Sequence, residues 1–314
     1  MVDSKQQWKA WLYLLPVIVL TLVFTVWPIV NTVRMAFLNG YNGMAVIGGA
    51  TYKIGISNFK WVIVMGDFTR SLTNTMLLTV LTVPLSTVLA LLIAVALHSI
   101  KPLQKILQTI YFLPYVTNSI AIGMVFAAMF SIVGNMGTDG NDIIITAGII
   151  NNLLDLFGIE PINWMNAGSS YWANITVMVV YIVWNALPFK ILILLGGLQG
   201  ISKQYYDAAK VDGTPRWRVL TRITVPLLSP MLAYVIITGF IGGFKEYSSI
   251  VGVFGEGMGP VGDDGRLNTM VGYIYEVLPQ MNYGQASAAA LILFGIILVV
   301  TMINTQVSKK RVHF

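Results

Sequence analysis

The chain has 314 residues, of which 56% are hydrophobic and only 10% are charged, and it contains no cysteine. A soluble domain carries about 25% charged residues, so this composition indicates an integral membrane protein and argues against a soluble enzyme. The net charge of +6 is interpreted as a topology signal and not as a sign of nucleic-acid binding. Without cysteine, disulfides and thiolate metal sites are excluded.

Six stretches are apolar and long enough to cross a bilayer, which takes about 20 residues. They are residues 10–36, 73–97, 106–131, 172–197, 227–252 and 285–307. The first is too long for the hydrophobic region of a cleavable signal peptide, so none is expected. The segment 143–157 is too short for a span and carries Asn151, Asn152 and Asp155. It is expected to form an interfacial or re-entrant helix.

The basic residues support six spans in a cell or inner membrane, with both termini in the cytoplasm. In that topology, 12 of the 19 Lys and Arg residues lie on the cytoplasmic side, whereas the outer loop 132–171 has none. This asymmetry follows the positive-inside rule. A seventh span at 143–157 would instead place the basic segment Lys203–Arg222 outside.

Two residues of the fourth predicted span, Trp184 and Asn185, have polar groups that could line a pathway, although packing is the favoured role for them. Lys190 lies two residues after Pro188 and is interpreted as reaching the inner membrane interface. Prolines in several spans remove backbone donors and are expected to kink the helices.

The fifth predicted span carries the adjacent ionisable residues Lys245 and Glu246, which are costly inside a membrane. On a helix they would point about 100° apart, so they would not simply neutralise each other. Glu246 could accept hydrogen bonds from a hydroxyl-rich ligand, and Phe244 or Tyr247 could stack on a sugar ring. The alternative is that Lys245 and Glu246 pair with a partner subunit or reach outward to the interface.

The chain lacks the motifs of nucleotide, metal or nucleophilic chemistry. No Gly-Lys-Ser/Thr sequence is present, so the chain is expected to bind no cofactor, and any ATP-driven work needs a partner. The two histidines, His98 and His313, lack metal-ligand spacing. No nucleophile–base pair is found, and no catalytic residue is predicted.

The most charged segment, Tyr205–Pro226, is predicted to be a cytoplasmic helix–turn–helix. Asp207–Lys210 suits a helix, Gly213 suits its C-terminal cap, and Pro215 suits the first turn of a second helix. That second helix combines apolar residues, among them Trp217, with three arginines. One apolar face on such a unit is suited to docking in a cleft of a soluble partner.

This segment resembles the Glu-Ala-Ala loop of ABC-importer permeases. Asp207-Ala208-Ala209 stands for Glu-Ala-Ala, Gly213 is the loop glycine, and Ile223–Pro226 is the ending, with Asp for Glu and Val225 for Leu as departures. The runs Ile106–Tyr115, Gly197–Ile201 and Tyr283–Ala288 add to the likeness. The chain thus resembles permeases of the carbohydrate family, of the maltose, oligosaccharide and glycerol-phosphate type.

The resemblance implies an all-α membrane protein with the ABC type I importer permease fold, six transmembrane helices and a coupling helix between spans four and five. Residues 1–70 would hold the N-terminal tail, first helix and an outer loop. Residues 71–310 would form the permease core, with coupling loop 203–226 and outer loop 132–171. The residues implied in ATPase coupling are Tyr206, Asp207, Ala208, Ala209, Asp212, Gly213, Trp217 and Arg218. Those expected along the substrate pathway are Lys245, Glu246, Tyr247, Phe244, Asn185 and Trp184.

The implied partners are a second permease, two ABC ATPase subunits that bind ATP and Mg²⁺, and an extracellular solute-binding protein that delivers a sugar. The candidate spans for the ligand, 172–197 and 227–252, hold Lys245, Glu246, aromatic residues and amides but no arginine, which favours an uncharged oligosaccharide over glycerol phosphate. A glycerol-3-phosphate or other polyol permease remains an alternative, as does a stand-alone secondary carrier. A carrier would be expected to show repeat symmetry between its halves, which is not evident in the sequence.

Overall fold

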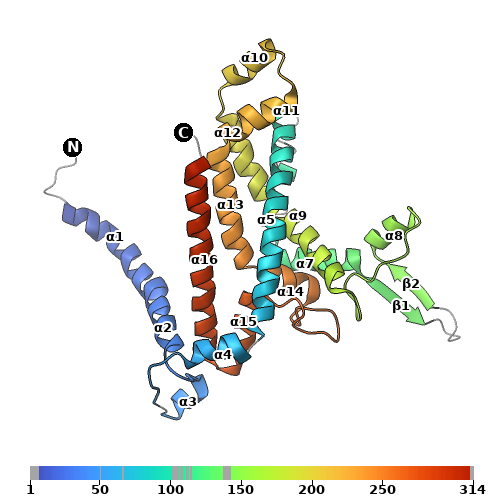
Figure 1. Ribbon diagram of the computed structural model, residues 1–314. Helices are drawn as coiled ribbons and strands as arrows, with labels where there is room; N and C mark the ends of the chain where they lie inside the picture. Colours follow the sequence, from blue (N-terminus) through green and yellow to red (C-terminus); the bar gives the residue numbers. More distant parts are fainter. Residues whose placement is uncertain are drawn as a thin grey trace. The chain divides into compact units, whose positions relative to one another are not determined.

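The computed structural model describes residues 7–49, 51–65, 67–100, 106, 109–110, 113, 115–136 and 143–311. These residues are helical apart from loops, an isolated bridge between Leu38 and Ile54, and one antiparallel hairpin (Figure 1). The hairpin pairs β1, Ile132–Met136, with β2, Ile143–Ala147, and Ile132 lies opposite Ala147. The other described elements are helical, as the expected all-α class requires, and the hairpin is a local departure within the predicted outer loop.

Among the residues that the structure describes, four helical segments are long and apolar enough to cross a membrane. They are Trp8–Ala36, formed by α1 (Gln7–Thr21), a π-helical turn (Leu22–Val26) and α2 (Trp27–Ala36), then α5 (Phe68–Ser99), α9 (Tyr171–Gln199) and α16 (Tyr283–Arg311). These segments cover four of the six predicted spans. Pro16, Pro84 and Pro188 lie inside them without ending the helix.

The fifth predicted span differs from the structure. Arg216–Leu227 and Ser229–Phe244 are bent by 72° relative to each other, and α13 (Ser229–Phe244) ends before Lys245. The chain then turns into the short helix α14 (Ser248–Phe254). Residues 227–252 are therefore not one straight span, because the backbone leaves the helix at the ionisable pair.

The third predicted span, 106–131, lies partly outside the described residues, and its described end is α7 (Ser119–Phe130). Asn118 caps α7 because its side-chain oxygen accepts from Ile120 N at 2.8 Å. The predicted helix 143–157 is correct only in part, since its first residues form β2 and the helix α8 spans Ile149–Asp155. The six-span count stays a prediction.

The chain forms two compact units, one of Met1–Thr69 with Tyr273–Phe294 and the other of Arg70–Gly272 with Gly295–Phe314. In the first unit lie α3 (Gly43–Ile47) and α4 (Ser57–Met65). The buried Asn58 of α4 donates to the carbonyls of Ala36 at 3.0 Å and Leu38 at 2.7 Å. Between the units the chain passes through α15 (Met270–Val277), followed by a 3₁₀ turn at Leu278–Gln280.

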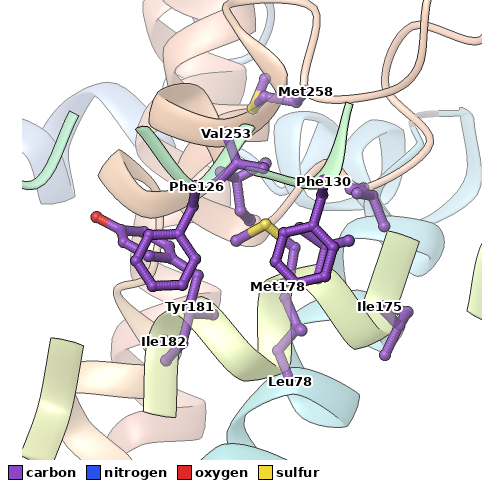
Figure 2. Packing of buried hydrophobic residues seen from close by; sticks show 12 residues of the cluster. Leu78, Phe126, Phe130, Ile175, Met178, Tyr181, Ile182, Val253 and Met258 are labelled. Atoms are coloured by element: carbon purple, nitrogen blue, oxygen red, sulfur yellow. The ribbon is translucent and has the colours of Figure 1, made fainter. Parts of the chain in front are cut away.

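The second unit packs around α5 and α9 with two apolar clusters. Near the hairpin, the aromatic rings of Phe126 and Phe130 from α7 lie against Met178 and Tyr181 of α9, as Figure 2 shows. Toward the other end of α9, aliphatic residues of α5, α9 and α13 form the second cluster together with Leu228, which precedes α13. Because both clusters share α9, this helix connects the two ends of the unit.

Helices α7 and α14 approach each other through glycine. A Cβ built on Gly123 would lie 2.6 Å from the Cα of Gly252, and one built on Gly252 would lie 3.0 Å from the Cα of Ile120. The first distance is too short for a side chain and the second is tighter than most Cβ contacts, and the atoms concerned are backbone atoms that cannot easily move. The contact therefore requires glycine at Gly123 and favours it at Gly252, as close crossings of membrane helices often do.

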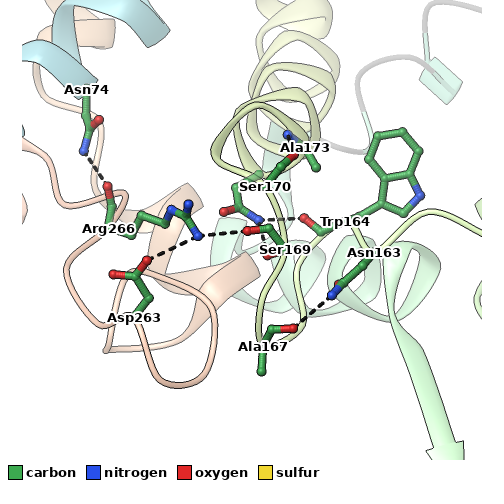
Figure 3. Close-up of polar contacts among 10 residues, drawn as sticks. Asn74, Asn163, Trp164, Ala167, Ser169, Ser170, Ala173, Asp263 and Arg266 are labelled. Carbon is green, nitrogen blue, oxygen red and sulfur yellow. Dashed lines mark hydrogen bonds and ion pairs between the residues drawn. The ribbon is translucent and has the colours of Figure 1, made fainter.

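Arg266, in the loop after α14, joins three parts of this unit (Figure 3). Its guanidinium donates to the carbonyl of Ser169 at 2.9 Å and lies 3.2 Å from the carboxylate of Asp263. Its own carbonyl accepts from the side chain of Asn74 at 3.0 Å. The start of α9, the first turns of α5 and the loop are thereby held together at one end of the bundle.

Candidate functional site

A cavity of about 290 Å³ lies among α5, α9 and α13. We refer to it as the transport cavity, because two of the residues that the sequence predicted along a substrate pathway, Asn185 and Glu246, line it. Its lining comprises hydroxyl, amide, aromatic, charged and glycine residues: Thr82, Val83, Ser86, Tyr115, Ile182, Asn185, Ala186, Phe189, Lys190, Val235, Thr238, Gly239, Gly242, Gly243 and Glu246. Most of these residues belong to helices that the sequence predicted as spans, so the cavity lies within the apolar bundle.

Lys190 is the buried cation of the transport cavity, with 4% of its surface exposed. Its Nζ donates to the carbonyl of Val83 at 3.1 Å, the hydroxyl of Ser86 at 2.7 Å and the hydroxyl of Thr87 at 2.9 Å. An ammonium has three donors, and all three bind α5. The interpretation that Lys190 reaches the membrane interface is therefore wrong.

Two hydroxyls on α5 are arranged to accept from this lysine. Ser86 donates its own proton to the carbonyl of Thr82 at 2.5 Å, and Thr87 donates to that of Val83 at 2.6 Å. Their lone pairs are then left for Lys190. The sequence did contain a signal for this polar stripe. Four hydroxyl residues recur every three or four positions on one apolar helix and so share a face: Thr75, Thr79, Thr82 and Ser86.

Glu246 enters the transport cavity because α13 ends just before it. The residue lies in the break between α13 and α14, where its carboxylate accepts from the backbone N–H of Ser249 at 3.3 Å. The hydroxyl of Thr269 donates to the Glu246 carbonyl at 2.7 Å. The residue is half-buried and lines the cavity, so its carboxylate can accept further hydrogen bonds there.

The aromatic surface of the transport cavity comes from Tyr115 and Phe189. Their rings are stacked, with centroids 5.8 Å apart and planes 18° apart. Glycines on α13 leave room on the other side. A Cβ on Gly243 would lie 2.8 Å from the side chain of Thr79, and one on Gly239 would lie 3.3 Å from Nζ of Lys190. Close approach of α13 to α5 and α9 therefore depends on these glycines.

Of the six residues expected along the pathway, Asn185 and Glu246 line the transport cavity. Phe244 is buried, Trp184 packs against Phe126 with ring centroids 5.2 Å apart, and Tyr247 packs against the cluster near the hairpin. Lys245 is exposed. Sequence reasoning did not single out Tyr115, Phe189 or the α13 glycines, because a ring or a glycine on an apolar helix does not reveal which way it faces.

The basic loop, residues 203–226, forms a helix, a tight turn and a second helical segment at the end of the second unit where α5 and α9 finish (Figure 1). Its parts are α10 (Lys203–Val211), α11 (Arg216–Val219), a π-helical turn (Leu220–Thr224) and α12 (Val225–Leu227). Gly213 has a φ of 63°, and Thr214 N donates back to Ala209 O at 2.9 Å, which is a glycine-capped helix end as predicted. Pro215 precedes the second helix with an extended backbone and is not in its first turn.

Most residues expected to couple to an ATPase are exposed on this loop: Asp207, Ala208, Asp212, Gly213, Trp217 and Arg218. Ala209 is buried, and the hydroxyls of Tyr206 and Thr224 lie 3.4 Å apart, which joins α10 to the second segment. Asp207 lies 3.8 Å from both Lys203 and Lys210. The coupling role of these residues stays a prediction, since this structure holds one chain.

The family described as binding-protein-dependent transport system inner membrane component matches residues 86–313 of this chain. The lactose transport system permease protein LacF of Rhizobium radiobacter is 28% identical over 303 residues, which cover 94% of this chain and 91% of that protein. The arabinooligosaccharides transport system permease protein AraP of Bacillus subtilis (strain 168) is 30% identical over 302 residues, covering 95% and 88%. A chain in the crystal structure of a bacterial ABC transporter involved in the import of the acidic polysaccharide alginate matches with a TM-score of 0.77 at 22% identity, covering 98% of this chain and 97% of that one. This last likeness shows a shared fold.

Proposed function

Because the chain belongs to the binding-protein-dependent transport system inner membrane components, we propose that it is the permease subunit of an ABC importer for a sugar, and specifically for an oligosaccharide. The transport cavity carries this proposal. It offers a stacked aromatic pair, the amide of Asn185 and the carboxylate of Glu246, and such groups bind the apolar face and the hydroxyls of a sugar. Relatives named for lactose and arabinooligosaccharides support the same substrate class.

The charges of the cavity favour an uncharged sugar over glycerol-3-phosphate or another phosphorylated polyol. Phosphate sites use arginines or free backbone donors. No arginine is among the described residues that line the cavity, and Lys190 already directs its three N–H groups to α5. The carboxylate of Glu246 would repel a phosphate. A glycerol-3-phosphate permease is the alternative. Uptake assays with an oligosaccharide and with glycerol-3-phosphate would distinguish the two functions.

The proposed assembly contains a second permease, two ABC ATPase subunits and an extracellular solute-binding protein in the cell or inner membrane. The basic loop would lie in the cytoplasm, as the positive-inside rule favours, and would dock in a cleft of one ATPase. Closure of the ATPases on ATP would push on α10 and switch the transport cavity between its two openings. The chain itself would bind no ATP or Mg²⁺ and would catalyse no reaction.

Replacement of Gly213 by valine tests the coupling role. The φ of 63° is disfavoured for a β-branched residue by about 1–2 kcal/mol, so the turn between α10 and α11 should change its geometry. We expect the Gly213→Val variant to remain in the membrane. It should no longer bind ATPase subunits in a pull-down, and its sugar uptake should be lost. The Gly213→Asn variant should retain more of the ATPase binding and more of the sugar uptake, because asparagine tolerates this conformation.

Gly40→Val is the matched control. Gly40 has a φ of 64° and open space around its Cβ position, as Gly213 does, but lies in the first unit outside the basic loop. This variant should keep its ATPase subunits and its uptake. Unchanged uptake in Gly213→Val, or equal losses in both valine variants, would contradict the assignment of the loop.

A further inference from the structure

A second cavity, of about 770 Å³, lies between the basic loop and the ends of α5 and α9. We call it the loop cavity. It is bounded by the ends of α5 and α9, by α10 and by the turn and second segment of the loop. Its lining is Val95, His98, Ser99, Leu198, Lys203, Tyr206, Ala209, Lys210, Gly213, Thr214, Arg216, Val219, Leu220 and Thr224. All lining residues belong to the second unit.

The loop cavity has an excess of basic side chains. Lys203 and Lys210 each lie 3.8 Å from the exposed carboxylate of Asp207, and exposed pairs of this kind are weak. Asp207 does not line the cavity. In the part of the chain that the structure describes, Arg216 and His98 form no ion pair and no side-chain hydrogen bond. An anion in the cavity would therefore meet the guanidinium of Arg216, which is not already neutralised, and two lysines that are held only in weak pairs.

The lining combines these cations with hydroxyl and apolar side chains. Ser99, Tyr206, Thr214 and Thr224 carry hydroxyls, whereas Val95, Leu198, Val219 and Leu220 are apolar. The cavity lies where α5 ends at Ser99 and α9 ends at Gln199. The end of a long apolar helix marks the level of the lipid headgroups. A soluble phosphorylated compound would gain little from the apolar wall, whereas a phosphate joined to hydrocarbon uses both kinds of surface.

We propose that the loop cavity binds the phosphate headgroup of an anionic phospholipid, with the first carbons of its chains against the apolar wall. Basic pockets between membrane helices bind such headgroups. The lipid would touch α5, α9 and α10 together and so brace the basic loop against the bundle. This lipid site does not depend on the proposed function, because binding is measured without transport.

The test is lipid retention by the protein, purified from membranes with any subunits that accompany it and placed in nanodiscs of phosphatidylcholine, with or without phosphatidylglycerol. Native mass spectrometry after mild release counts the bound phosphatidylglycerol. We expect wild-type protein to retain phosphatidylglycerol in preference to phosphatidylcholine. The variant Arg216→Gln should bind it about fivefold more weakly, as expected for removal of one basic group near a membrane surface. Arg216→Lys, which keeps the charge, should restore most of the affinity.

Arg222→Gln is the control, because Arg222 is exposed on the same loop but does not line the cavity. It should retain phosphatidylglycerol as the wild type does. Equal retention of the two lipids, or equal losses in the Arg216→Gln and Arg222→Gln variants, would overturn the proposal. Displacement of the lipid by soluble glycerol phosphate at the same concentration would also overturn it and indicate a water-soluble ligand.

Discussion

Lys190 shows how a single charged residue is accommodated inside an apolar bundle. Its ammonium is buried among three neutral acceptors on α5, and in the described residues no carboxylate lies within ion-pair distance of it. Moving a charge from water into such a site costs several kcal/mol, and hydrogen bonds to a charged group each return about 1.5–3 kcal/mol. The site is therefore specific for a donor at this position.

We predict that Lys190→Glu destabilises the protein far more than Lys190→Met. A glutamate would place a carboxylate, which only accepts, against the carbonyl of Val83 and two hydroxyls that already donate to the backbone. Methionine removes the charge and the hydrogen bonds together and fills a similar volume. The measurement is thermal unfolding of detergent-purified protein. Lys60→Glu, at an exposed position of α4, should behave as wild type. Equal melting temperatures for the two Lys190 variants would contradict this account.

Glu246→Gln should raise the KM for sugar uptake about tenfold, with little change in protein level. The amide can still accept from the N–H of Ser249, so the break between α13 and α14 should persist. A hydrogen bond from a sugar hydroxyl to a charged acceptor is worth about 1.5 kcal/mol or more, and that gain would be lost. Uptake of radiolabelled sugar at varied concentration gives KM and maximal rate. Glu256→Gln, at an exposed residue outside the transport cavity, is the control. A normal KM in Glu246→Gln would show that the Glu246 carboxylate does not contribute to sugar binding.

Two features position helices of this protein relative to one another: glycines that permit close contact, and the points at which helices end. Gly123 and Gly252 bring α7 and α14 together, and Gly239 and Gly243 let α13 approach α9 and α5. Because α13 ends at Phe244, the chain turns there before α14 begins. This turn places Glu246 at the transport cavity. The shape of the cavity is thus decided by contacts between helices and not by any one helix.

Gly123→Ala should destabilise the protein, whereas Gly196→Ala should not. A methyl group on Gly123 would overlap the backbone of Gly252, whereas nothing lies within 4 Å of the Cβ position of Gly196. In an open helical position, alanine is favoured over glycine by about 1 kcal/mol. We therefore expect a lower melting temperature for Gly123→Ala and an equal or higher one for Gly196→Ala. Matching shifts in both variants would argue against close packing of α7 on α14.

At the scale of the molecule, the second unit contains both the transport cavity and the basic loop, with α5, α9 and α13 running between them. The same three helices form the apolar cluster of Leu194, Leu228, Val235 and their neighbours. A push on the loop would therefore reach the cavity through α9, through α13 beyond its 72° bend, and through this packed cluster. This arrangement fits alternating access driven by a partner.

Transport should require the partner ATPases and ATP. We expect purification in mild detergent to recover a second permease and a P-loop ATPase with this chain. Proteoliposomes of the complex should import sugar only when binding protein is outside and ATP with Mg²⁺ is on the side of the basic loop. Removal of Mg²⁺ with a chelator should stop uptake. Sugar movement by this chain alone, without ATP, would indicate a secondary carrier and contradict the proposed function.

The sequence by itself determined the membrane class, four of the long apolar helices and the glycine-capped turn at Gly213, because these depend on local composition and on the backbone freedom of one residue. The resemblance of Asp207–Pro226 to a coupling loop also pointed to the family that the chain matches. Tertiary structure alone decided that Lys190 binds α5, that the fifth span bends and stops at Phe244, and that residues 143–147 form a strand. These features depend on neighbours distant in the chain, and a hydropathy pattern contains no information about which of them a side chain will meet.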